Sequence, residues 1–425
     1  MKIVHLSTYD INGGAARAAY RLHTGLRCIG HDSSMFVAHC ESRDPSVITF
    51  QPPMDFPIRV RRRLRSIQIS RNFARYRSSR PAGSELFSDD RTPHGTAPLR
   101  QLPSCDVINL HWINKFIDYQ SFFTTVPRYT PVVLTLHDMN FFTGGCHYDH
   151  GCGGFRQRCG SCPQLGSHTE DDLSRQVWRR KHDVLGTIGE ERLQVVANSH
   201  WLAHEAHNSS LLSKFPVTTI HFGLDTDTFA PRNRHFARDV LGVPQDAKVV
   251  LFVAHAVNAR RKGFALLAQA LNGLDDLPGL FLISLGHGKS AIDARFPHLL
   301  LGQIDNDCFL SLIYSAADVF VIPSLQEAFG QTALESLACG TPVVGFAVGG
   351  IPDIVHHGIS GLLVPPEDVD ALRTAIVDLL QDPAKRAEMS INGRRIAEER
   401  HSLEAQARHY VDLYEKLVGK SENVT

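Results

Sequence analysis

The feature that most constrains the fold is a regular alternation of short apolar runs with helical patterns. In the first half of the chain, the strand-like runs occupy residues 2–7, 34–39, 106–111, 131–136 and 193–198. Helical patterns occupy residues 15–26, 173–185 and 200–212. Strands that alternate with helices form βαβ units and a parallel sheet. We therefore predict an α/β domain here.

The same alternation begins again after a proline-bearing stretch at 222–234. Strand-like runs occupy 248–254, 280–285, 318–322 and 342–346, and helical patterns occupy 264–274, 307–317, 331–338 and 369–380. We predict two α/β domains, at 1–220 and 221–400, followed by a tail helix at 401–425. Apolar residues recur along the tail at helical spacing, so one of its faces must pack on another element.

Composition excludes several classes of protein. The chain has 425 residues, 43% of them apolar and 21% charged, as in ordinary globular proteins. Lys plus Arg equals Asp plus Glu at 44 each, so no overall field favours nucleic acid, and we expect no nucleic-acid partner. No signal sequence or run of about 18 apolar residues is visible, so we expect a cytoplasmic protein.

The most informative stretch runs from Pro323 to Pro342. A predicted buried strand ends at Pro323, a loop carries Glu327 and Gly330, and a helix follows with Glu335 one turn inside it. Free backbone N–H groups at a helix start bind anions, and glycine allows a ligand to come close. A carboxylate such as Glu335 can accept paired ribose hydroxyls. For an isolated pair of glutamates, solvated surface charges would be the preferred interpretation.

The flanking sequence alters that preference, because it resembles the signature of family-4-type retaining glycosyltransferases with the GT-B fold. The run from Glu327 to Glu335 reads Glu-Ala-Phe-Gly-Gln-Thr-Ala-Leu-Glu, followed by Ala-Cys-Gly-Thr-Pro-Val-Val at 338–344. Further matches occur at 349–353, 361–365 and 223–229, at Gly13-Gly14, and at the pair His137-Asp138. The resemblance implies two Rossmann-like domains facing a cleft, with the tail helix crossing back onto the N-terminal domain.

In such enzymes the residue at Glu327 contacts the donor sugar and the residue at Glu335 holds the nucleotide ribose. The resemblance thus implies a donor site that includes the following residues: Glu327, Phe329, Gly330, Gln331, Thr332 and Glu335. A basic pair clamps the diphosphate, and Lys262 fits the Lys position. Family members often place an Arg five residues earlier, where this chain has Val257. Arg261 or Arg260 could substitute from the adjacent position. Arg suits bidentate contact with phosphate, and Lys acts as a point charge.

Two features of the first domain lie where ligands gather in α/β sheets. His137 ends a strand-like run at its carboxyl end, and the resemblance places such a His against the donor sugar. A structural histidine bonded to a loop carbonyl is the alternative. Gly13-Gly14 leads into a helix, which suits a phosphate or an acceptor, although a Gly-Gly pair alone is usually a turn. We assign His137, Lys262 and Glu327 to catalysis, and Gly13, Gly14 and Arg261 to donor binding.

Four cysteines gather in a loop at 143–165. Cys146, Cys152, Cys159 and Cys162 have the ligand number and type of a tetrahedral zinc site, although their spacing is irregular for a zinc ribbon. His147 could replace one thiolate, and two disulfides or free thiols are the alternatives. We expect a structural zinc there and no cofactor for catalysis. Some exopolysaccharide glycosyltransferases look similar in this loop, and the chain as a whole resembles bacterial exopolysaccharide and colanic-acid-type glycosyltransferases.

The segment 58–80 is strongly basic. Arg59 to Arg80 contains nine Arg and no acidic residue, with Val60, Leu64, Ile67 and Phe73 as an approximate apolar stripe. A basic amphipathic helix is typical of a membrane-surface element, so we expect an anionic membrane surface as a partner and a peripheral location on the inner face. A solvated face is nearly as good an interpretation.

The predicted function is metal-independent, retaining transfer of a sugar from a nucleotide-sugar, UDP- or GDP-linked, to a glycan or lipid-linked acceptor. Synthesis of bacterial exopolysaccharide or cell-surface polysaccharide is the expected setting. A sugar-nucleotide epimerase or a phosphorylase could share the architecture. A non-enzymatic nucleic-acid binder would use the basic segment and the cysteine loop, but it would have no use for Glu327 and Glu335.

Overall fold

The computed structural model describes residues 1–257, 259–274, 277–288 and 296–422. The chain divides into two compact units. The N-terminal unit comprises Met1–His221 together with Gln406–Thr425, and the C-terminal unit comprises Phe222–Ala405. The last three residues of the predicted tail, 423–425, lie outside the described residues.

The N-terminal unit is built on one parallel sheet of seven strands in the order β3-β2-β1-β4-β5-β6-β7. The strands are β1 (Lys2–Tyr9), β2 (Asp32–His39), β3 (Val47–Thr49), β4 (Val107–Leu110), β5 (Val132–Leu136), β6 (Leu193–Ala197) and β7 (Val217–Thr219). The helices are α1 (Gly14–Cys28), α2 (Phe56–Ala74), α3 (Tyr119–Thr125), α4 (Leu173–Gly186), α5 (His200–His207) and α13 (Leu403–Glu422). Every residue of β4, β5 and β6 is buried, as expected of parallel strands covered on both faces.

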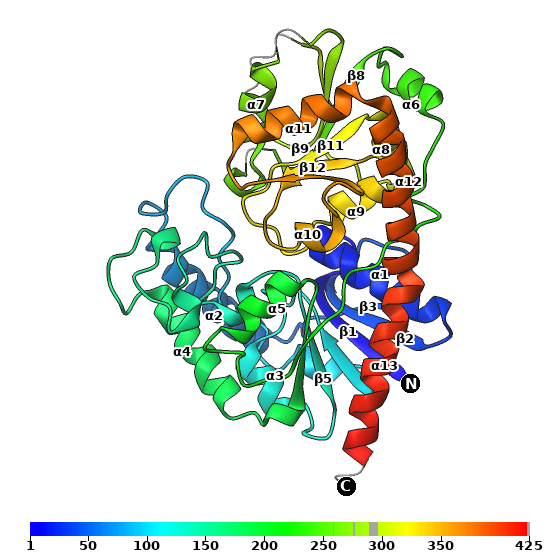
Figure 1. Ribbon diagram of the computed structural model, residues 1–425. Helices are drawn as coiled ribbons and strands as arrows, with labels where there is room; N and C mark the ends of the chain where they lie inside the picture. Colours follow the sequence, from blue (N-terminus) through cyan, green and yellow to red (C-terminus); the bar gives the residue numbers. More distant parts are fainter. Residues whose placement is uncertain (258, 275–276, 289–295, 423–425) are drawn as a thin grey trace. The chain divides into compact units, whose positions relative to one another are not determined.

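The C-terminal unit has a six-stranded parallel sheet in the order β10-β9-β8-β11-β12-β13. Its strands are β8 (Lys248–Ala256), β9 (Leu280–His287), β10 (His298–Leu300), β11 (Val319–Ile322), β12 (Val343–Phe346) and β13 (Gly361–Val364). Its helices are α6 (Arg234–Leu241), α7 (Phe264–Asn272), α8 (Asp307–Ala316), α9 (Gln331–Ala338), α10 (Ile351–Ile354), α11 (Val369–Gln381) and α12 (Pro383–Arg400). In both units the strand order reverses beside the first strand, as in a Rossmann fold. The two predicted α/β domains are confirmed (Figure 1).

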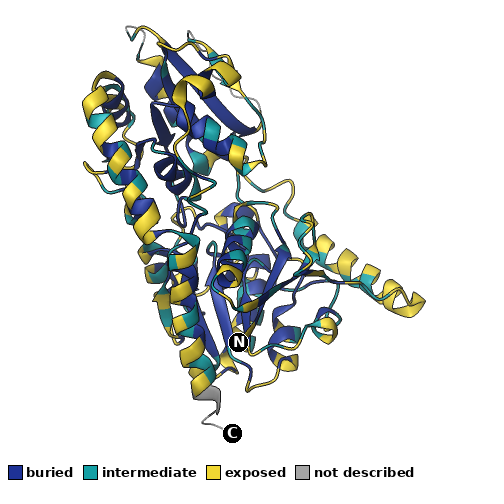
Figure 2. Ribbon diagram, turned by 90° about the vertical axis from the view of Figure 1, so that its right-hand side faces the viewer, coloured by how far each residue is buried: buried dark blue, intermediate teal, exposed yellow. Residues whose placement is uncertain are grey.

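Helix α13 closes one face of the N-terminal sheet. Ala407, Tyr410 and Tyr414 are fully buried in one apolar cluster with residues of β1, β4, β5 and β6. The Tyr410 hydroxyl lies 3.0 Å from Thr135 Oγ1, and Asn109 Nδ2 donates to the Tyr414 hydroxyl over 2.7 Å. Figure 1 shows α13 running beside this sheet, and Figure 2 shows the strands coloured as buried. The apolar stripe predicted for the tail helix therefore packs on the N-terminal unit.

The basic segment predicted at 58–80 lies mostly in helix α2, which ends at Ala74, and the chain after it continues as turns. None of the residues of α2 is buried. Val60, Leu64 and Ile67 are exposed by 42%, 63% and 39% respectively, so the predicted stripe has no apolar partner along most of the helix. Only Phe73 packs at its end, against the apolar cluster that holds Cys146 and Cys162. Across the described helices, none combines the length and the hydropathy needed to cross a bilayer.

Candidate active site

In the C-terminal unit, the loops after β8 and β11 bring together three residues predicted for the donor site, the cations Arg261 and Lys262 and the carboxylate Glu327. Lys262 Nζ donates to Glu327 Oε2 over 2.5 Å, and an Arg261 guanidinium nitrogen lies 3.6 Å from the same oxygen. The arginine also donates to the Gln326 carbonyl over 2.8 Å. The backbone N–H of Leu325 donates to the Arg261 carbonyl, which ties the two loops together.

Glu327 is ionised in this setting. Its burial would raise the carboxyl pKa, but the charges of Lys262 and Arg261, with hydrogen bonds from Lys262 and Ser324, hold the pKa below its usual value. Only 8% of Glu327 is exposed. A buried carboxylate of this kind accepts hydrogen bonds, and its two cations are multiple donors, because an ammonium has three N–H groups and a guanidinium has five.

Gly330, the glycine predicted to let a ligand come close to the backbone, lies at the start of α9. Gly330 has φ +104°, a conformation that L side chains rarely adopt, and it caps the helix directly after the Glu327 loop. Its neighbour Phe329 is buried, with its ring edge to face against Phe222. Gln331 and Thr332 form the first turn of the helix and are partly exposed.

Glu335 lies on the buried side of α9 rather than on an exposed helix surface. It is 7% exposed, and the Tyr314 hydroxyl donates to its Oε2 over 3.1 Å. A carboxylate offers about four acceptor positions, so its chemistry suits paired hydroxyls. The interpretation of Glu327 and Glu335 as ordinary solvated charges does not fit their burial.

The two arginines that could complete the phosphate clamp have different surroundings. Arg261 is half-buried at Glu327, as described above. Arg260 is exposed and lines a cavity of about 470 Å³ together with Val257, Phe264 and Leu325. Arg261 is therefore the arginine placed beside Lys262 and Glu327.

In the N-terminal unit, the predicted residues follow the carboxyl ends of strands. Gly13 has φ +88° and caps α1, whose first residue is Gly14, and a side chain at Gly13 would meet open space. His137 directly follows β5. Its Nε2 lies 2.9 Å from Nδ1 of His111, which directly follows β4. Burial lowers the pKa of His137 to about 4, against the opposing charge of Asp138.

Asp138 is fixed by three hydrogen bonds to its carboxylate. The donors are Trp112 Nε1 at 3.1 Å, His147 Nδ1 at 2.6 Å and the Asn140 backbone N–H at 2.8 Å. The other ring nitrogen of His147 lies 2.9 Å from Ser88 Oγ. Ser88 is 4% exposed, so this Asp–His–Ser row packs the loop after β5 rather than exposing a nucleophile.

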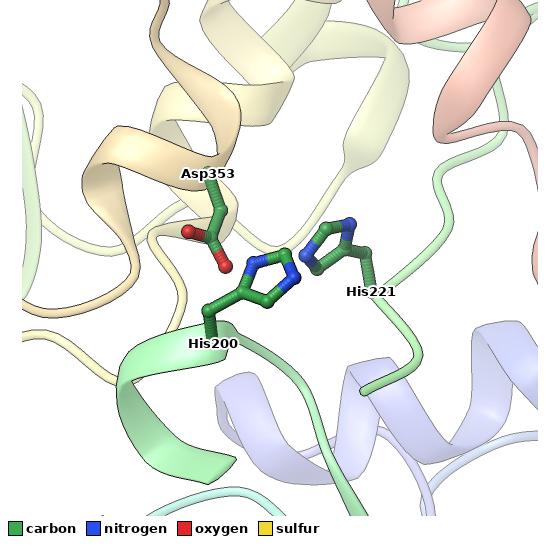
Figure 3. A group of neighbouring side chains, drawn as sticks. All are labelled: His200, His221 and Asp353. Carbon is green, nitrogen blue, oxygen red and sulfur yellow. The ribbon is translucent and has the colours of Figure 1, made fainter. Parts of the chain in front are cut away.

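Histidines follow four neighbouring strands of this sheet. His111 and His137 follow β4 and β5, while His200 begins α5 after β6 and His221 comes shortly after β7. The rings of His200 and His221 lie edge to face with centroids 5.4 Å apart (Figure 3). Asp353, also drawn in Figure 3, belongs to the C-terminal unit. Sequence reasoning selected only His137, although position after a strand was a signal that the other three shared.

The four cysteines of the 143–165 loop lie near one another, but not in the geometry of a bound metal. Cys146, Cys159 and Cys162 are buried and Cys152 is exposed, all as thiols. Burial raises the pKa of Cys146 well above its usual value, and the other three thiols raise it further. Within the part of the chain that the structure describes, no three of these sulfur atoms lie within 4.8 Å of one another. The ligand type suits zinc, whereas tetrahedral coordination would require the sulfurs to move together.

Comparisons with known proteins match this architecture. Residues 233–396 match the family model described as "Glycosyl transferases group 1". A D-inositol 3-phosphate glycosyltransferase of Mycobacterium avium is 32% identical over 222 residues, which are 48% of this chain and 51% of that protein. The enzyme of the same name from Mycolicibacterium smegmatis is 33% identical over 220 residues, 47% of this chain and 49% of that protein. The chain thus spans about half the length of the curated relatives it matches.

Solved structures extend the likeness of the fold to the whole chain. Sucrose-phosphate synthase from Thermosynechococcus elongatus has a TM-score of 0.66 at 22% identity, covering 99% of this chain and 100% of that one. The catalytic domain of starch synthase IV from Arabidopsis thaliana, bound to ADP and acarbose, has a TM-score of 0.67 at 14% identity, covering 98% and 99%. The chain has the GT-B fold, as the sequence predicted, and its C-terminal unit resembles group 1 glycosyltransferases.

Proposed function

We propose that this protein is a glycosyltransferase that moves a sugar from a nucleoside diphosphate sugar to an acceptor hydroxyl with retention of anomeric configuration. The observation that carries the proposal is the cluster of Arg261, Lys262 and ionised Glu327 beside the glycine-capped start of α9, with Glu335 buried one turn further on. The group 1 family match and the curated relatives, named as glycosyltransferases, support it.

Each of these residues has a role in breaking the bond between the sugar and the diphosphate. Negative charge grows on the departing diphosphate, and fixed cations and helix N-termini stabilise it without reorganising. Lys262 and Arg261 supply the cations, and the backbone of Gly330, Gln331 and Thr332 supplies N–H groups. Glu327 accepts hydrogen bonds from the donor sugar and Glu335 accepts them from the ribose. Because these groups are sufficient to stabilise a diphosphate, we propose that catalysis is independent of a metal.

In the N-terminal unit we assign His137 to the donor sugar and Gly13-Gly14 to the diphosphate or the acceptor. No residue is proposed as a covalent nucleophile. The departing phosphate takes the proton of the acceptor hydroxyl on the same face of the sugar, which retains the configuration. We propose a UDP- or GDP-sugar as the donor, and cytoplasmic polysaccharide synthesis as the setting.

The acceptor proposed is a glycan or a lipid-linked sugar at the inner membrane face. The exposed, arginine-rich helix α2 supports this location, because its apolar residues remain uncovered among its cations. A structural zinc in the 143–165 loop is part of the same proposal. The supporting observation is that three of the four thiols, those of Cys146, Cys159 and Cys162, are buried within this one loop.

Thermal-shift measurement of the full chain with UDP-, GDP-, ADP- and CMP-sugars, without added metal, tests the donor site. A ligand that binds only the folded state stabilises it by about 2.7 kcal/mol at a concentration of 100 Kd. We expect a shift with one nucleotide class, lost in Glu335→Ala. The matched control is Glu388→Ala, which removes an exposed glutamate of α12 in the same unit.

Acceptor-dependent release of nucleoside diphosphate then separates transfer from the rival activities. An epimerase releases no diphosphate, and a phosphorylase requires phosphate rather than a nucleotide-sugar. If a well-folded sample showed no shift with any nucleotide-sugar, the proposal would be wrong and a binding protein would become the better interpretation.

A further inference from the structure

Lys181 is a buried cation of the N-terminal unit for which the proposed sugar transfer has no use. It lies on α4 and is 0% exposed. Its Nζ donates to the carbonyl of Asn140 over 2.5 Å and to the carbonyl of Thr143 over 3.1 Å. The ammonium also lies over the ring of Tyr119, with 5.1 Å between Nζ and the ring centroid. These three contacts account for the three donors of an ammonium group.

This ammonium has no adjacent carboxylate to balance its charge. Among the described residues, no carboxylate oxygen lies within 4.0 Å of its Nζ. Asp90 and Asp138 act on it from a greater distance, and both bond to other donors. Asp90 accepts from Arg180 over 2.9 Å, and Asp138 accepts from His147 over 2.6 Å. Because a buried charge without a partner is costly, we expect another source of negative charge close to Lys181.

One peptide group connects Lys181 to the cysteine loop. Its carbonyl, that of Thr143, accepts the hydrogen bond from the ammonium, and its N–H, that of Gly144, donates to Cys159 Sγ over 3.1 Å. A cation at the carbonyl polarises the peptide and makes its N–H a stronger donor. Glycine is required at 144, because a Cβ there would lie 2.6 Å from the Cβ of Cys159 and 2.4 Å from the carbonyl oxygen of Ser174. The arrangement favours negative charge on the sulfur of Cys159.

A second glycine leaves space beside two of the sulfurs. A Cβ at Gly154 would lie 3.9 Å from Cys152 Sγ and 4.0 Å from Cys159 Sγ. Since glycine has no side chain, this position next to both sulfurs stays open. Four thiolates around one zinc ion have a net charge of about −2, which is the kind of charge that a buried ammonium would offset.

We infer that Lys181 is the counter-cation of a metal–thiolate centre in the 143–165 loop, and that it acts on Cys159 through the Thr143–Gly144 peptide. Lys181 is a positioning and charge-balancing residue and not a ligand. Free thiols or disulfides in this loop would have no charge and would leave the ammonium unbalanced. The inference rests on the zinc site of the proposed function and is independent of sugar transfer.

Zinc affinity of the full chain tests this role of Lys181. Competition of the zinc-loaded protein with a chromophoric chelator measures the affinity. Lys181→Met removes the charge from a side chain of similar length, and we expect the affinity for Zn²⁺ to fall by on the order of 10-fold. The matched control is Lys214→Met. Lys214 also donates to a carbonyl, that of Ile188 at 2.7 Å, and lies 4.9 Å from the ring centroid of Phe215, but it is outside the loop.

Melting temperatures with and without Zn²⁺ separate charge balance from a merely structural role. We expect Lys181→Met to lower the melting temperature more in the zinc-loaded protein than in the metal-free one. Equal losses in the two states, or an unchanged affinity for Zn²⁺, would overturn the inference and leave the zinc site standing. A wild-type protein that binds no Zn²⁺ would overturn both.

A second variant covers the case in which Lys181→Met does not fold. Lys181→Gln keeps an N–H donor for the two carbonyls but removes the charge, so the same two readouts then decide. Weaker zinc binding by the glutamine variant supports the inference, and unchanged binding contradicts it. Acceptor-dependent sugar transfer is measured separately, so its failure would leave this test intact.

Discussion

Glu327 offsets one of the two positive charges at its site before any ligand arrives. Lys262 and Arg261 share one carboxylate oxygen, so neither cation is left as an isolated charge before a ligand arrives. Removing Glu327 would leave two like charges side by side. The carboxylate therefore has two uses in the proposed function, since it orders the phosphate-binding cations and accepts hydrogen bonds from the sugar.

A second carboxylate of the C-terminal unit has a purely structural use. Asp318 is 4% exposed and bonds to Arg238 at 2.9 Å, to Arg234, and to the backbone N–H of Val249 at 2.7 Å. Arg238 is 1% exposed. Asp318→Ala would leave the buried guanidinium of Arg238 without its carboxylate partner. We expect a loss of about 3–5 kcal/mol in the free energy of unfolding.

Urea unfolding of the full chain measures this loss. Asp370→Ala is the matched control, since the Asp370 side chain is 87% exposed and pairs with Arg373 on the surface. Exposed pairs of this kind contribute about 0–1 kcal/mol. Equal effects of the two substitutions would contradict the structural role of Asp318.

The sequence indicated the C-terminal site better than the N-terminal one, for a physical reason. Glu327, Gly330 and Glu335 lie in one continuous run, so their spacing along a loop and a helix can be read directly. The neighbours of His137 depend on which strands pair. His5 and His111 are far from it in sequence, and only the order β1-β4-β5 brings the rings together.

At the scale of elements, long apolar runs were predicted well and short edge strands were not. The run at 131–136 became β5, Val132–Leu136, whereas β3 and β7 have three residues each and were missed. The helix predicted at 200–212 ends at His207, because Asn208, Ser209 and Ser210 follow and such residues favour turns over helix. Helix α12 was also missed.

Helix α2 should bind anionic membranes through its exposed arginines. Each basic residue near such a surface contributes about 1 kcal/mol, so Arg59→Gln, Arg61→Gln and Arg63→Gln together should weaken binding by on the order of 100-fold. Vesicle sedimentation with anionic and neutral lipids measures this. A control variant that loses Arg395, Arg400 and Lys416 removes the same charge elsewhere. Equal weakening in both variants, or equal binding to neutral vesicles, would count against a specific role of α2.

The cysteine loop should contain about one zinc per chain if four thiolates bind it. Burial favours the thiol forms, so an unfilled site should remain protonated, and metal binding should release protons. Elemental analysis of protein purified without chelator, with a titration of accessible thiols, measures this. Cys159→Ser should lose the metal, and Cys28→Ser, an exposed cysteine elsewhere, should keep it. A metal-free wild-type protein with four reactive thiols would show the prediction to be wrong.

For the whole molecule, the buried histidines predict loss of stability in mild acid. Burial lowers the pKa of His23, His94 and His137 to about 4, and that of His5 and His111 well below its usual value. Between pH 4 and the unfolded value of 6.5, the unfolded chain binds more protons than the folded one. Stability is therefore fully present above pH 6.5 and falls as the pH drops, by about 1.4 kcal/mol per pH unit for each fully buried histidine and by less for His94, which is partly exposed to solvent.

One carboxyl group acts in the opposite direction. Burial raises the pKa of Asp90 to about 6, so it stabilises the folded state as the pH falls, but it is outnumbered by the histidines. Melting temperatures measured from pH 8 to pH 4.5 test the combined effect of the histidines and Asp90. His94→Asn should make the melting temperature fall less steeply as the pH drops. Constant stability between pH 6.5 and 5 would show that these histidines are not held neutral.

The place of α13 has a consequence for how the protein is made. Ala407, Tyr410 and Tyr414 complete an apolar core whose other members include Ile3 and Val107. The ribosome synthesises those early strands first, then the entire C-terminal unit, and only then the helix that covers them. The N-terminal unit is thus begun first and finished last. A nascent chain must carry an uncovered sheet face throughout the synthesis of the C-terminal unit, which makes this stretch of translation the period when a chaperone is most needed.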